Sequence, residues 1–459
     1  MKASPRQLMN LRRNCCGKID RRAETKTINS WELAHNRLYM LISIGRTPEN
    51  EISCRPIQKK GNESFAPTTY EFTAELLRKR KRTPENEISN INLYNKEKNM
   101  TSRQFLKRFF IGSSSLLLLC IAVVVIFDPF FQYHKALPGL KAVLADKEYQ
   151  VVGTLKNFDY DSVVVGSSVA ENYNNSWFDE GFNCHVIKAI RSYGATADLC
   201  YLLDEAFEHQ QLKYVFYNLD PSALVADPEP TFELTGCPMY LYDDNYINDI
   251  QYVLNKGVLF EKIPYMIAKS VTGDYNEDES YNWAQWKEFN SDMALGLYIR
   301  KPSVAEEKPE KYYEDLLSQN LELLTSRIEA HPETQFYIFM PPYSMLWWDS
   351  TYRDGDLAAY LYNMETAMNT LLEYENVRCF YFMNDRETIL NLENYMDILH
   401  FSDEINHQIC NDLIDGKFEV TKENCHETIE DMRFLADEIV TKLILPYEDR
   451  IKFDLVDEE

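Results

Sequence analysis

One uninterrupted apolar run constrains this chain more than any other feature of its sequence. Residues 109–127 carry no charged side chain over 19 positions, and as a helix they would extend roughly 28 Å, close to the hydrocarbon thickness of a bilayer. Lys107 and Arg108 stand just before the run, and Asp128 follows it. A buried core helix is usually shorter, and no small-residue cleavage site of a signal sequence follows. The run therefore predicts a single-pass cell-membrane protein with a cytoplasmic N-terminus and an extracytoplasmic main domain.

The charge of the chain is divided at this run. Residues 1–108 hold 23 Lys and Arg against 11 Asp and Glu, a net charge of +12, whereas the whole chain carries −24, so the remainder carries −36. The front segment has few regularly spaced apolar positions, and we expect a basic, largely disordered cytoplasmic tail. Because an acidic body of this size repels phosphate backbones, no nucleic-acid partner is expected for the main domain.

Beyond residue 127 the pattern changes to an alternation of short apolar runs and long amphipathic stretches. We interpret residues 128–157 as a tether and residues 158–459 as the main domain. Parallel strands need crossover connections, so the alternation predicts an α/β fold, a flavodoxin-like three-layer sandwich whose parallel sheet has helices on both faces. The aromatic and acidic residues 221–300 break the alternation and are expected to form an insertion that covers one end of the sheet. The expected strands are 161–166, 184–189, 214–219, 335–340 and 378–382, and the expected helices are 195–210, 311–330 and 356–374.

A serine follows the first expected strand directly. The run 161–166 ends at Gly166, and Ser167 and Ser168 come next, at the start of a probable helix. Sites in open α/β sheets lie beyond the carboxyl ends of the strands, and backbone N–H groups at a helix N-terminus can stabilise an anion. Serine is also a common helix cap, so this motif alone favours the structural interpretation.

A carboxylate and a histidine follow the last expected strand. Asp397 and His400 are three residues apart in a loop before a helix that is expected to begin near Asp403. An aspartate in this position can hold one imidazole nitrogen, which leaves the other nitrogen free to take a proton from a serine. An isolated Asp-x-x-His pair would more often cap a turn, so the hypothesis depends on its combination with the serine.

The strand, the Gly-Ser-Ser turn, the helix and the late Asp-x-x-His motif together resemble the SGNH, or GDSL-type, hydrolase superfamily. Gly166-Ser167-Ser168 stands where other members carry Gly-Asp-Ser. The likeness is to the membrane-anchored branch, which includes proteins for the D-alanylation of teichoic acid and the O-acetylation of polysaccharides. The resemblance implies that Ser168 is the nucleophile, His400 the general base and Asp397 its orienting partner.

The same resemblance implies an oxyanion hole. Gly194, after the second expected strand, matches the glycine whose N–H contributes to the hole. The Gly-x-Asn-Asp motif of the family is replaced by Tyr217-Asn218-Leu219-Asp220, so Asn218 is displaced by one position. Losing one oxyanion donor costs about 10²–10³ in turnover, and the displacement therefore leaves open a slow enzyme or an inactive relative.

Four residues near the C-terminus offer other chemistry. His407, Cys410, Cys425 and His426 are possible zinc ligands, but the Cys-x-x-Cys spacing of a zinc knuckle is missing, and ordinary helix packing is the favoured interpretation. We expect no metal and no cofactor. Cys410 and Cys425 are also the closest cysteine pair beyond the apolar run, so a disulfide between them is an open alternative.

The sequence as a whole predicts a membrane-anchored, extracytoplasmic serine esterase or O-acyltransferase that acts on acylated cell-envelope glycans. Its expected partner is an acylated cell-surface polysaccharide or a lipid-linked glycan, with the membrane reached through residues 109–127. The alternative is a non-catalytic envelope protein that keeps the same fold for binding. The displaced Asn218 favours the alternative, whereas the intact Ser168, Asp397 and His400 favour the enzyme.

Overall fold

The computed structural model describes residues 101–232 and 236–453, and within them one helix is long and apolar enough to cross a membrane. This helix, α5 (Ser102–Phe127), contains the whole of the expected run and begins seven residues before it. Its first turn is closed by a capping box, in which the side chains of Thr101 and Gln104 each accept the other's backbone N–H. The expected tail before residue 101 lies outside the described residues.

Residues 128–157, expected to be a tether, belong to the folded domain. Asp128 ends α5 in the left-handed conformation, and its buried carboxylate accepts the backbone N–H groups of residues 132–134. Helix α6 (Lys147–Asn157) then packs on β2 and α8. The tether prediction is wrong because the many polar residues of α6 hide the few apolar positions that pack on the domain. The buried apolar side chains of α6 are Val151, Val152 and Leu155.

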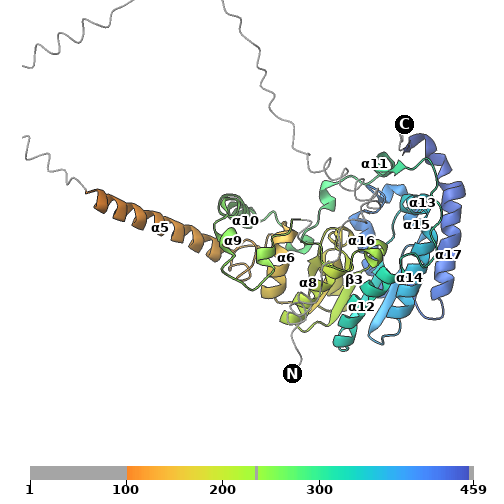
Figure 1. Ribbon diagram of the computed structural model, residues 1–459, viewed down its shortest axis with the longest axis horizontal. Coiled ribbons are helices and arrows are strands. Elements are labelled where there is room, and N and C mark those ends of the chain that lie inside the picture. Colours follow the sequence, from red (N-terminus) through yellow and green to blue (C-terminus); the bar gives the residue numbers. More distant parts are fainter. Residues whose placement is uncertain (1–100, 233–235, 454–459) are drawn as a thin grey trace, which may run out of the picture. The chain divides into compact units, whose positions relative to one another are not determined.

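The centre of the domain is a six-stranded sheet in the order β2-β1-β3-β5-β6-β7 (Figure 1). All neighbouring strands are parallel except the edge pair of β6 and β7. The five expected strands are all present within two residues of their predicted bounds, because β-branched and aromatic runs bounded by polar residues mark buried strands. The strands are β1 (Ser162–Gly166), β2 (Val186–Ile190), β3 (Tyr214–Asn218), β5 (Gln335–Met340), β6 (Val377–Tyr381) and β7 (Glu419–Val420).

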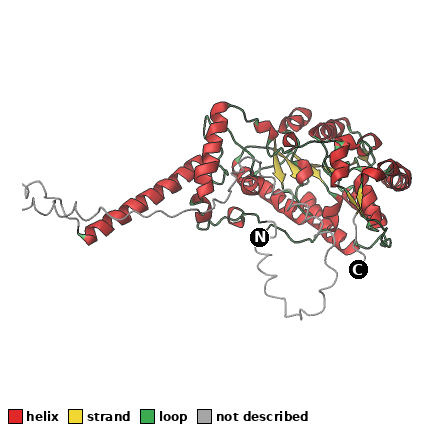
Figure 2. Ribbon diagram, turned by 90° about the horizontal axis from the view of Figure 1, so that it is seen from above, coloured by secondary structure: helices red, strands yellow, loops and turns green. Residues whose placement is uncertain are grey.

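Helices cover both faces of this sheet (Figure 2). Neighbouring residues of a strand point to opposite faces of the sheet. On β5, Phe336 contacts Phe207 of α8, whereas Tyr337 contacts Phe182 of α7, so α8 and α7 lie on opposite faces. Helices α8, α12 and α14 pack in sequence along one face, and α7 and α16 contact each other on the opposite face. These helices are α7 (Asn175–Phe182), α8 (Thr196–His209), α12 (Glu314–Ala330), α14 (Leu357–Leu371) and α16 (Asp403–Asp415), accompanied by α13 (Met345–Arg353), α15 (Arg386–Ile389) and α17 (Cys425–Glu438).

The segment expected as an insertion, residues 221–300, folds into short helical pieces. Its last residues form β4, which pairs in parallel with β8 near the C-terminus and makes a second, two-stranded sheet. The pieces are η2 (Pro221–Val225), η3 (Met239–Leu241), α9 (Ile250–Val253), η4 (Val258–Lys262), α10 (Ile263–Thr272), η5 (Glu277–Glu279), η6 (Ala284–Trp286), α11 (Ser291–Leu297) and β4 (Ile299–Arg300). The remaining short elements are η1 (Ser168–Ala170), η7 (Leu392–Asn394), η8 (Ile439–Leu443), η9 (Leu445–Arg450) and β8 (Lys452–Phe453).

Candidate active site

Ser168 lies where the strand order of the sheet reverses. β1 has β2 on one side and β3 on the other, and ligands of doubly wound sheets bind beyond the carboxyl ends of the strands at such a point. The chain turns from β1 into η1 at Gly166, where an added Cβ would lie 2.6 Å from the Cβ of Ala170 and 2.9 Å from that of Asn218. Glycine is therefore required there, and the tight turn places Ser168 at the edge of the sheet.

The loop that carries Asp397 and His400 is held by the segment that follows β5. The Tyr395 hydroxyl donates to the carbonyl of Pro342 at 2.6 Å, and the backbone N–H and hydroxyl of Ser344 both donate to the carbonyl of Ile398. A β-bridge between residues 395 and 401 closes the loop. The two residues are thus brought to the carboxyl edge of the sheet from a distant part of the chain.

Ser168, His400 and Asp397 form a continuous chain of hydrogen bonds. The Ser168 Oγ is 2.8 Å from His400 Nε2, and His400 Nδ1 is 2.7 Å from Asp397 Oδ2. A carboxylate only accepts hydrogen bonds, so Nδ1 carries the hydrogen, and Nε2 is left to accept the hydroxyl proton of Ser168. The other carboxylate oxygen accepts the backbone N–H groups of Leu399 and His400, both at 2.8 Å, which fixes the orientation of Asp397.

The surroundings of His400 favour its protonated form. Burial lowers the pKa of His400, but the charge of Asp397 and its hydrogen bond outweigh burial, with smaller effects from Glu171 and Asp220, so the pKa is raised above 6.5. Burial raises the pKa of Asp397, yet the charge of His400 and the hydrogen bonds from its side chain and from the loop backbone hold that pKa below its usual value. The pair is therefore built to stabilise an imidazolium ion.

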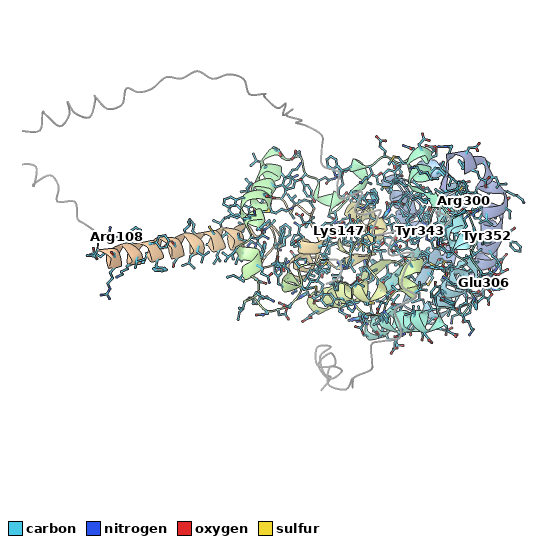
Figure 3. The ribbon with its side chains drawn as sticks, turned by 45° about the horizontal axis from the view of Figure 1, so that its top comes forward. Arg108, Lys147, Arg300, Glu306, Tyr343 and Tyr352 are labelled. Carbon is cyan, nitrogen blue, oxygen red and sulfur yellow. The ribbon has the colours of Figure 1, made fainter. Side chains whose placement is uncertain are left out.

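Glu171 supplies a second buried negative charge near His400. Its carboxylate is paired with Lys147 Nζ at 2.8 Å and accepts the Ser192 hydroxyl at 2.7 Å (Figure 3 labels Lys147). Burial raises the pKa of Glu171 despite these partners. Glu171 has no recognisable motif in the sequence, because a lone glutamate in a short helical turn carries no local signal of burial.

A third carboxylate, that of Asp220, organises the polar groups behind the serine. Its oxygens accept hydrogen bonds from the Tyr343 hydroxyl (labelled in Figure 3) and from Asn218 Nδ2, and the Ser167 side chain bonds to it as well. Burial raises the pKa of Asp220, and these three bonds oppose the shift. Asp220 lies in the sequence segment that was compared with the oxyanion motif, but its own role was missed.

The two predicted oxyanion donors both have partners inside the protein. The Gly194 N–H donates to the carbonyl of Arg191 at 2.9 Å, and Asn218 is fully buried with its amide donating to Asp220 at 3.1 Å. The Gly194 N–H is therefore not available as an oxyanion donor in this conformation. By contrast, the Ser168 N–H meets no hydrogen-bond acceptor among residues 101–232 and 236–453. Gly194 still has a packing role, since an added Cβ would lie 2.8 Å from Leu199.

Trp283, from the segment 221–300, covers the serine and the histidine. Its Nε1–H donates to the carbonyl of Ser168 at 3.2 Å, and its ring lies edge to face against His400 with 5.2 Å between ring centres. The neighbouring backbone N–H groups of residues 283 and 284 donate to the buried side chain of Asn172, which follows η1. Residues 283 and 284 of the segment expected as an insertion therefore lie over the candidate triad and η1.

The four possible zinc ligands lie apart in the structure. His407 stacks on Trp177, whereas His426 is exposed and pairs with Glu365 at 2.8 Å. Cys410 and Cys425 are both buried and free, so the alternative of a disulfide between them is excluded in this structure. Within the described ranges, no group of three or more potential ligands lies close enough to hold a metal ion.

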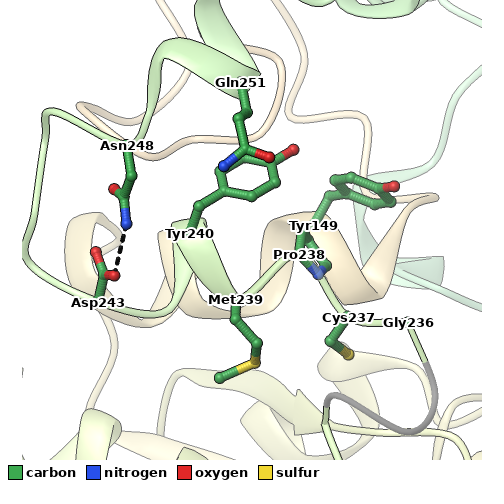
Figure 4. Close-up of a pocket in the computed structure, with 9 residues that line it drawn as sticks. All are labelled: Tyr149, Gly236, Cys237, Pro238, Met239, Tyr240, Asp243, Asn248 and Gln251. Carbon is green, nitrogen blue, oxygen red and sulfur yellow. Dashed lines mark hydrogen bonds between the residues drawn. The ribbon is translucent and has the colours of Figure 1, made fainter.

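A shallow, open cavity of about 540 Å³ has none of the three triad residues in its wall (Figure 4). Its wall combines aromatic rings with polar groups, among them an Asn248 amide that donates to Asp243. Cys237, in the same wall, accepts a hydrogen bond from Arg191, three residues before Gly194. The lining residues are Tyr149, Gly236, Cys237, Pro238, Met239, Tyr240, Asp243, Asn248 and Gln251.

Fold and site define an α/β protein with a Ser–His–Asp hydrogen-bonded chain at the carboxyl edge of a mostly parallel sheet. No family model matches this sequence, and no curated protein matches it either. The function is therefore argued from the geometry of the site.

Proposed function

We propose that this protein is a membrane-anchored serine esterase or O-acyltransferase of the SGNH type. The observation that carries the proposal is the 2.8 Å contact between Ser168 and His400, continued by the 2.7 Å contact to Asp397. This arrangement comes from two segments 232 residues apart and matches the requirements for an activated serine nucleophile, namely a base within hydrogen-bond reach and a group that orients the base.

The reaction follows from these three side chains. Ser168 Oγ attacks the carbonyl carbon of an ester while His400 Nε2 takes the hydroxyl proton, and the resulting imidazolium is stabilised by Asp397. Collapse of the tetrahedral intermediate breaks the ester bond, and His400 returns the proton to the departing alcohol oxygen. Water or an acceptor hydroxyl then attacks the acyl-serine, with His400 again taking and returning one proton. Hydrolysis and transfer differ only in this second nucleophile.

An acylated glycan of the cell envelope is the substrate class that we favour. α5 would hold the site close to a membrane, where surface polymers and lipid-linked glycans are found. Trp283 beside the triad, and Tyr149 and Tyr240 in the cavity of Figure 4, provide rings of the kind that stack on sugars next to polar groups. Extracytoplasmic placement follows from the positive charge before α5 and is part of the proposal.

A non-catalytic binding protein is the second candidate, and one observation favours it. The N–H of Gly194 and the amide of Asn218 both donate within the protein, so of these two groups and the Ser168 N–H, the Ser168 N–H is the one without an internal partner among the described residues. An enzyme with one such donor would be slow by a factor of about 10²–10³. The two candidates therefore differ in whether Ser168 reacts at all.

The deciding experiment is the reaction of the full-length protein, in detergent micelles, with a fluorophosphonate, which phosphonylates an activated serine and releases fluoride. We expect mass spectrometry to place the adduct on Ser168, and Ser168→Ala and His400→Ala to abolish it. Ser326→Ala and His426→Ala are the matched controls, because each removes the same functional group at an exposed position outside the triad, and both should retain labelling. Hydrolysis of p-nitrophenyl acetate should likewise be lost in the two triad variants and kept in the two controls. An inert wild type whose thermal unfolding is cooperative would favour the binding protein.

A further inference from the structure

A group of exposed apolar side chains lies on the elements that contact α5 and on the residues next to them. Between residues 246 and 271 seven large apolar side chains are exposed, against ten in all the other described residues outside α5. Such side chains scattered singly are ordinary, but a concentration of this kind marks a surface with a partner. The seven are Tyr246, Ile247, Ile250, Leu254, Phe260, Tyr265 and Val271, and we refer to them as the apolar collar.

The collar is carried on structure that is fixed to the domain. The helical stretch formed by η4 and α10 buries Val258, Ile263 and Met266 on its inner side. The same stretch is fastened to the chain that follows α5, since the Ser270 hydroxyl accepts the Lys141 N–H at 2.8 Å and Lys262 is paired with Asp146 at 2.6 Å. Phe260 and Val271 remain 71% and 81% exposed, so the stretch has one face on the domain and one apolar face outward.

This outward face lies at the foot of the membrane-spanning candidate. α5 contacts both α9 and η4, and the Tyr252 hydroxyl of α9 donates to Asp128, the residue that ends α5 (Figures 1 and 2). A bilayer that surrounds α5 would therefore reach α9 and η4 at the level of its headgroups. Tyrosines such as Tyr246 and Tyr265 are enriched at that level because they combine an apolar ring with a polar hydroxyl.

The charge of the collar differs from that of the domain. The span of the collar, residues 246–271, contains three lysines, Lys256, Lys262 and Lys269, and two acidic residues, Asp249 and Glu261, whereas the chain beyond residue 108 has a large acidic excess. Lys262 and Lys269 are paired with Asp146 and Asp274. An acidic surface is repelled by anionic headgroups, and lysines beside an apolar face are typical of helices that lie in a membrane interface. The span of the collar thus lacks the acidic excess that would repel a lipid surface, and its contact with α5 favours lipid over a further copy of this chain.

We propose that the apolar collar is inserted into the headgroup region of the leaflet at the carboxyl end of α5, with lipid as its partner. The domain is then attached at two places, by α5 across the bilayer and by α9, η4 and α10 along its surface. This contact limits tilting of the domain about the end of α5. It also sets the cavity of Figure 4 beside the lipid surface, because Gln251 of α9 lines that cavity while Ile250, its neighbour, belongs to the collar. The inference is independent of the proposed function.

Photo-crosslinking of the full-length protein in liposomes of phosphatidylcholine and phosphatidylglycerol tests the collar. Benzoylphenylalanine is placed at Phe260 or Val271, at Leu118 in the middle of α5, and at Phe434 on α17, which is 70% exposed and serves as the matched control. All four positions are exposed, so the substitutions should leave thermal unfolding unchanged. We expect lipid adducts at positions 260 and 271 in yields close to that at 118, and at least ten times lower yields at 434.

Two results would overturn the proposal. Adducts at position 118 together with yields at 260 and 271 no higher than at 434 would show that the collar does not reach lipid. Protein dimers in place of lipid adducts at 260 and 271 would identify a second copy of the chain as the partner. Loss of lipid adducts has no bearing on the labelling of Ser168 by a fluorophosphonate. The two experiments therefore test the membrane contact of the collar and the proposed serine chemistry independently.

Discussion

The hydrogen bond from His400 Nδ1 to Asp397 determines which imidazole nitrogen faces Ser168. A neutral imidazole has one N–H, and the carboxylate claims it, so the lone pair on Nε2 points at the hydroxyl. The backbone bonds from Leu399 and His400 to the same carboxylate prevent its rotation. The state of the histidine is thus set by a residue that never touches the substrate.

The substitution Asp397→Asn tests this arrangement. The amide can keep the backbone bonds through its oxygen, but its NH₂ group would face Nδ1 and favour the wrong tautomer. We expect kcat to fall by about 10³–10⁴, as for the equivalent change in other serine triads, with thermal unfolding within a few degrees of wild type. An Asn variant with nearly full p-nitrophenyl acetate activity would contradict the assigned role of Asp397.

The pH dependence of acylation reports on the charges around His400. Only the neutral imidazole accepts the serine proton, so the rate should be lost as pH falls through the pKa of His400, which lies above 6.5. Replacing Glu171 by Gln removes a negative charge that favours the imidazolium and leaves Lys147 nearby, so the acidic limb of the profile should move to lower pH. A stopped-flow pH profile of fluorophosphonate labelling measures the shift. A limb that stays in place or moves to higher pH would rule out this electrostatic coupling.

The sequence predicted the three hydrogen-bonded residues of the candidate triad better than their neighbours. Ser168 follows β1 in a Gly-Ser-Ser turn, and Asp397 and His400 form an Asp-x-x-His motif, so both patterns are readable from a few neighbouring residues. Glu171 and Asp220 have no such pattern, because their burial and their partners come from tertiary packing. The donor role assigned to Gly194 depended on the path of a turn, and the structure uses its N–H within that turn instead.

At the scale of elements, the site depends on how three separate segments meet. The turn after β1 brings the serine, the loop after η7 brings the histidine, and the segment 221–300 covers both with Trp283. The strands were predictable because each is an apolar run of its own. The path of the segment 221–300 was not predictable, because contacts with the rest of the domain determine its short helical pieces, which have no clear periodicity in the sequence.

The substitution Trp283→Phe tests the hydrogen bond of Trp283 apart from the packing of its ring. The variant loses the Nε1–H bond to the Ser168 carbonyl and keeps an aromatic ring beside His400. A single neutral hydrogen bond is worth about 1 kcal/mol, so we expect a loss of about fivefold in kcat/KM for p-nitrophenyl acetate. Trp286→Phe is the matched control, since Trp286 is exposed in the same segment, and it should behave as wild type. Equal effects of both variants would argue against a positioning role for Trp283.

For the whole molecule, stability is tied to charges that are buried away from the site. Arg300, the last residue of β4, forms a two-pronged ion pair with Asp349, and both side chains are buried. Lys188 on β2 is also buried, with its Nζ donating to the backbone carbonyls of Glu171 and Ser280. A charge that is held by carbonyl groups alone costs more to bury than one in an ion pair.

The last prediction concerns the pH dependence of unfolding. Burial lowers the pKa of Lys188 to about 7, against about 10.4 when the chain is unfolded, so between these values the unfolded chain binds more protons. Stability from this group is therefore lowest below pH 7 and rises with pH, by about 2 kcal/mol between pH 7 and pH 9. Lys188→Met leaves the two carbonyl groups without their donor and also removes the buried charge, so it should lack this rise. Lys287→Met, at an exposed position, should keep the wild-type slope. Thermal unfolding of the full-length protein across this range measures the difference, and parallel curves for wild type and Lys188→Met would refute it.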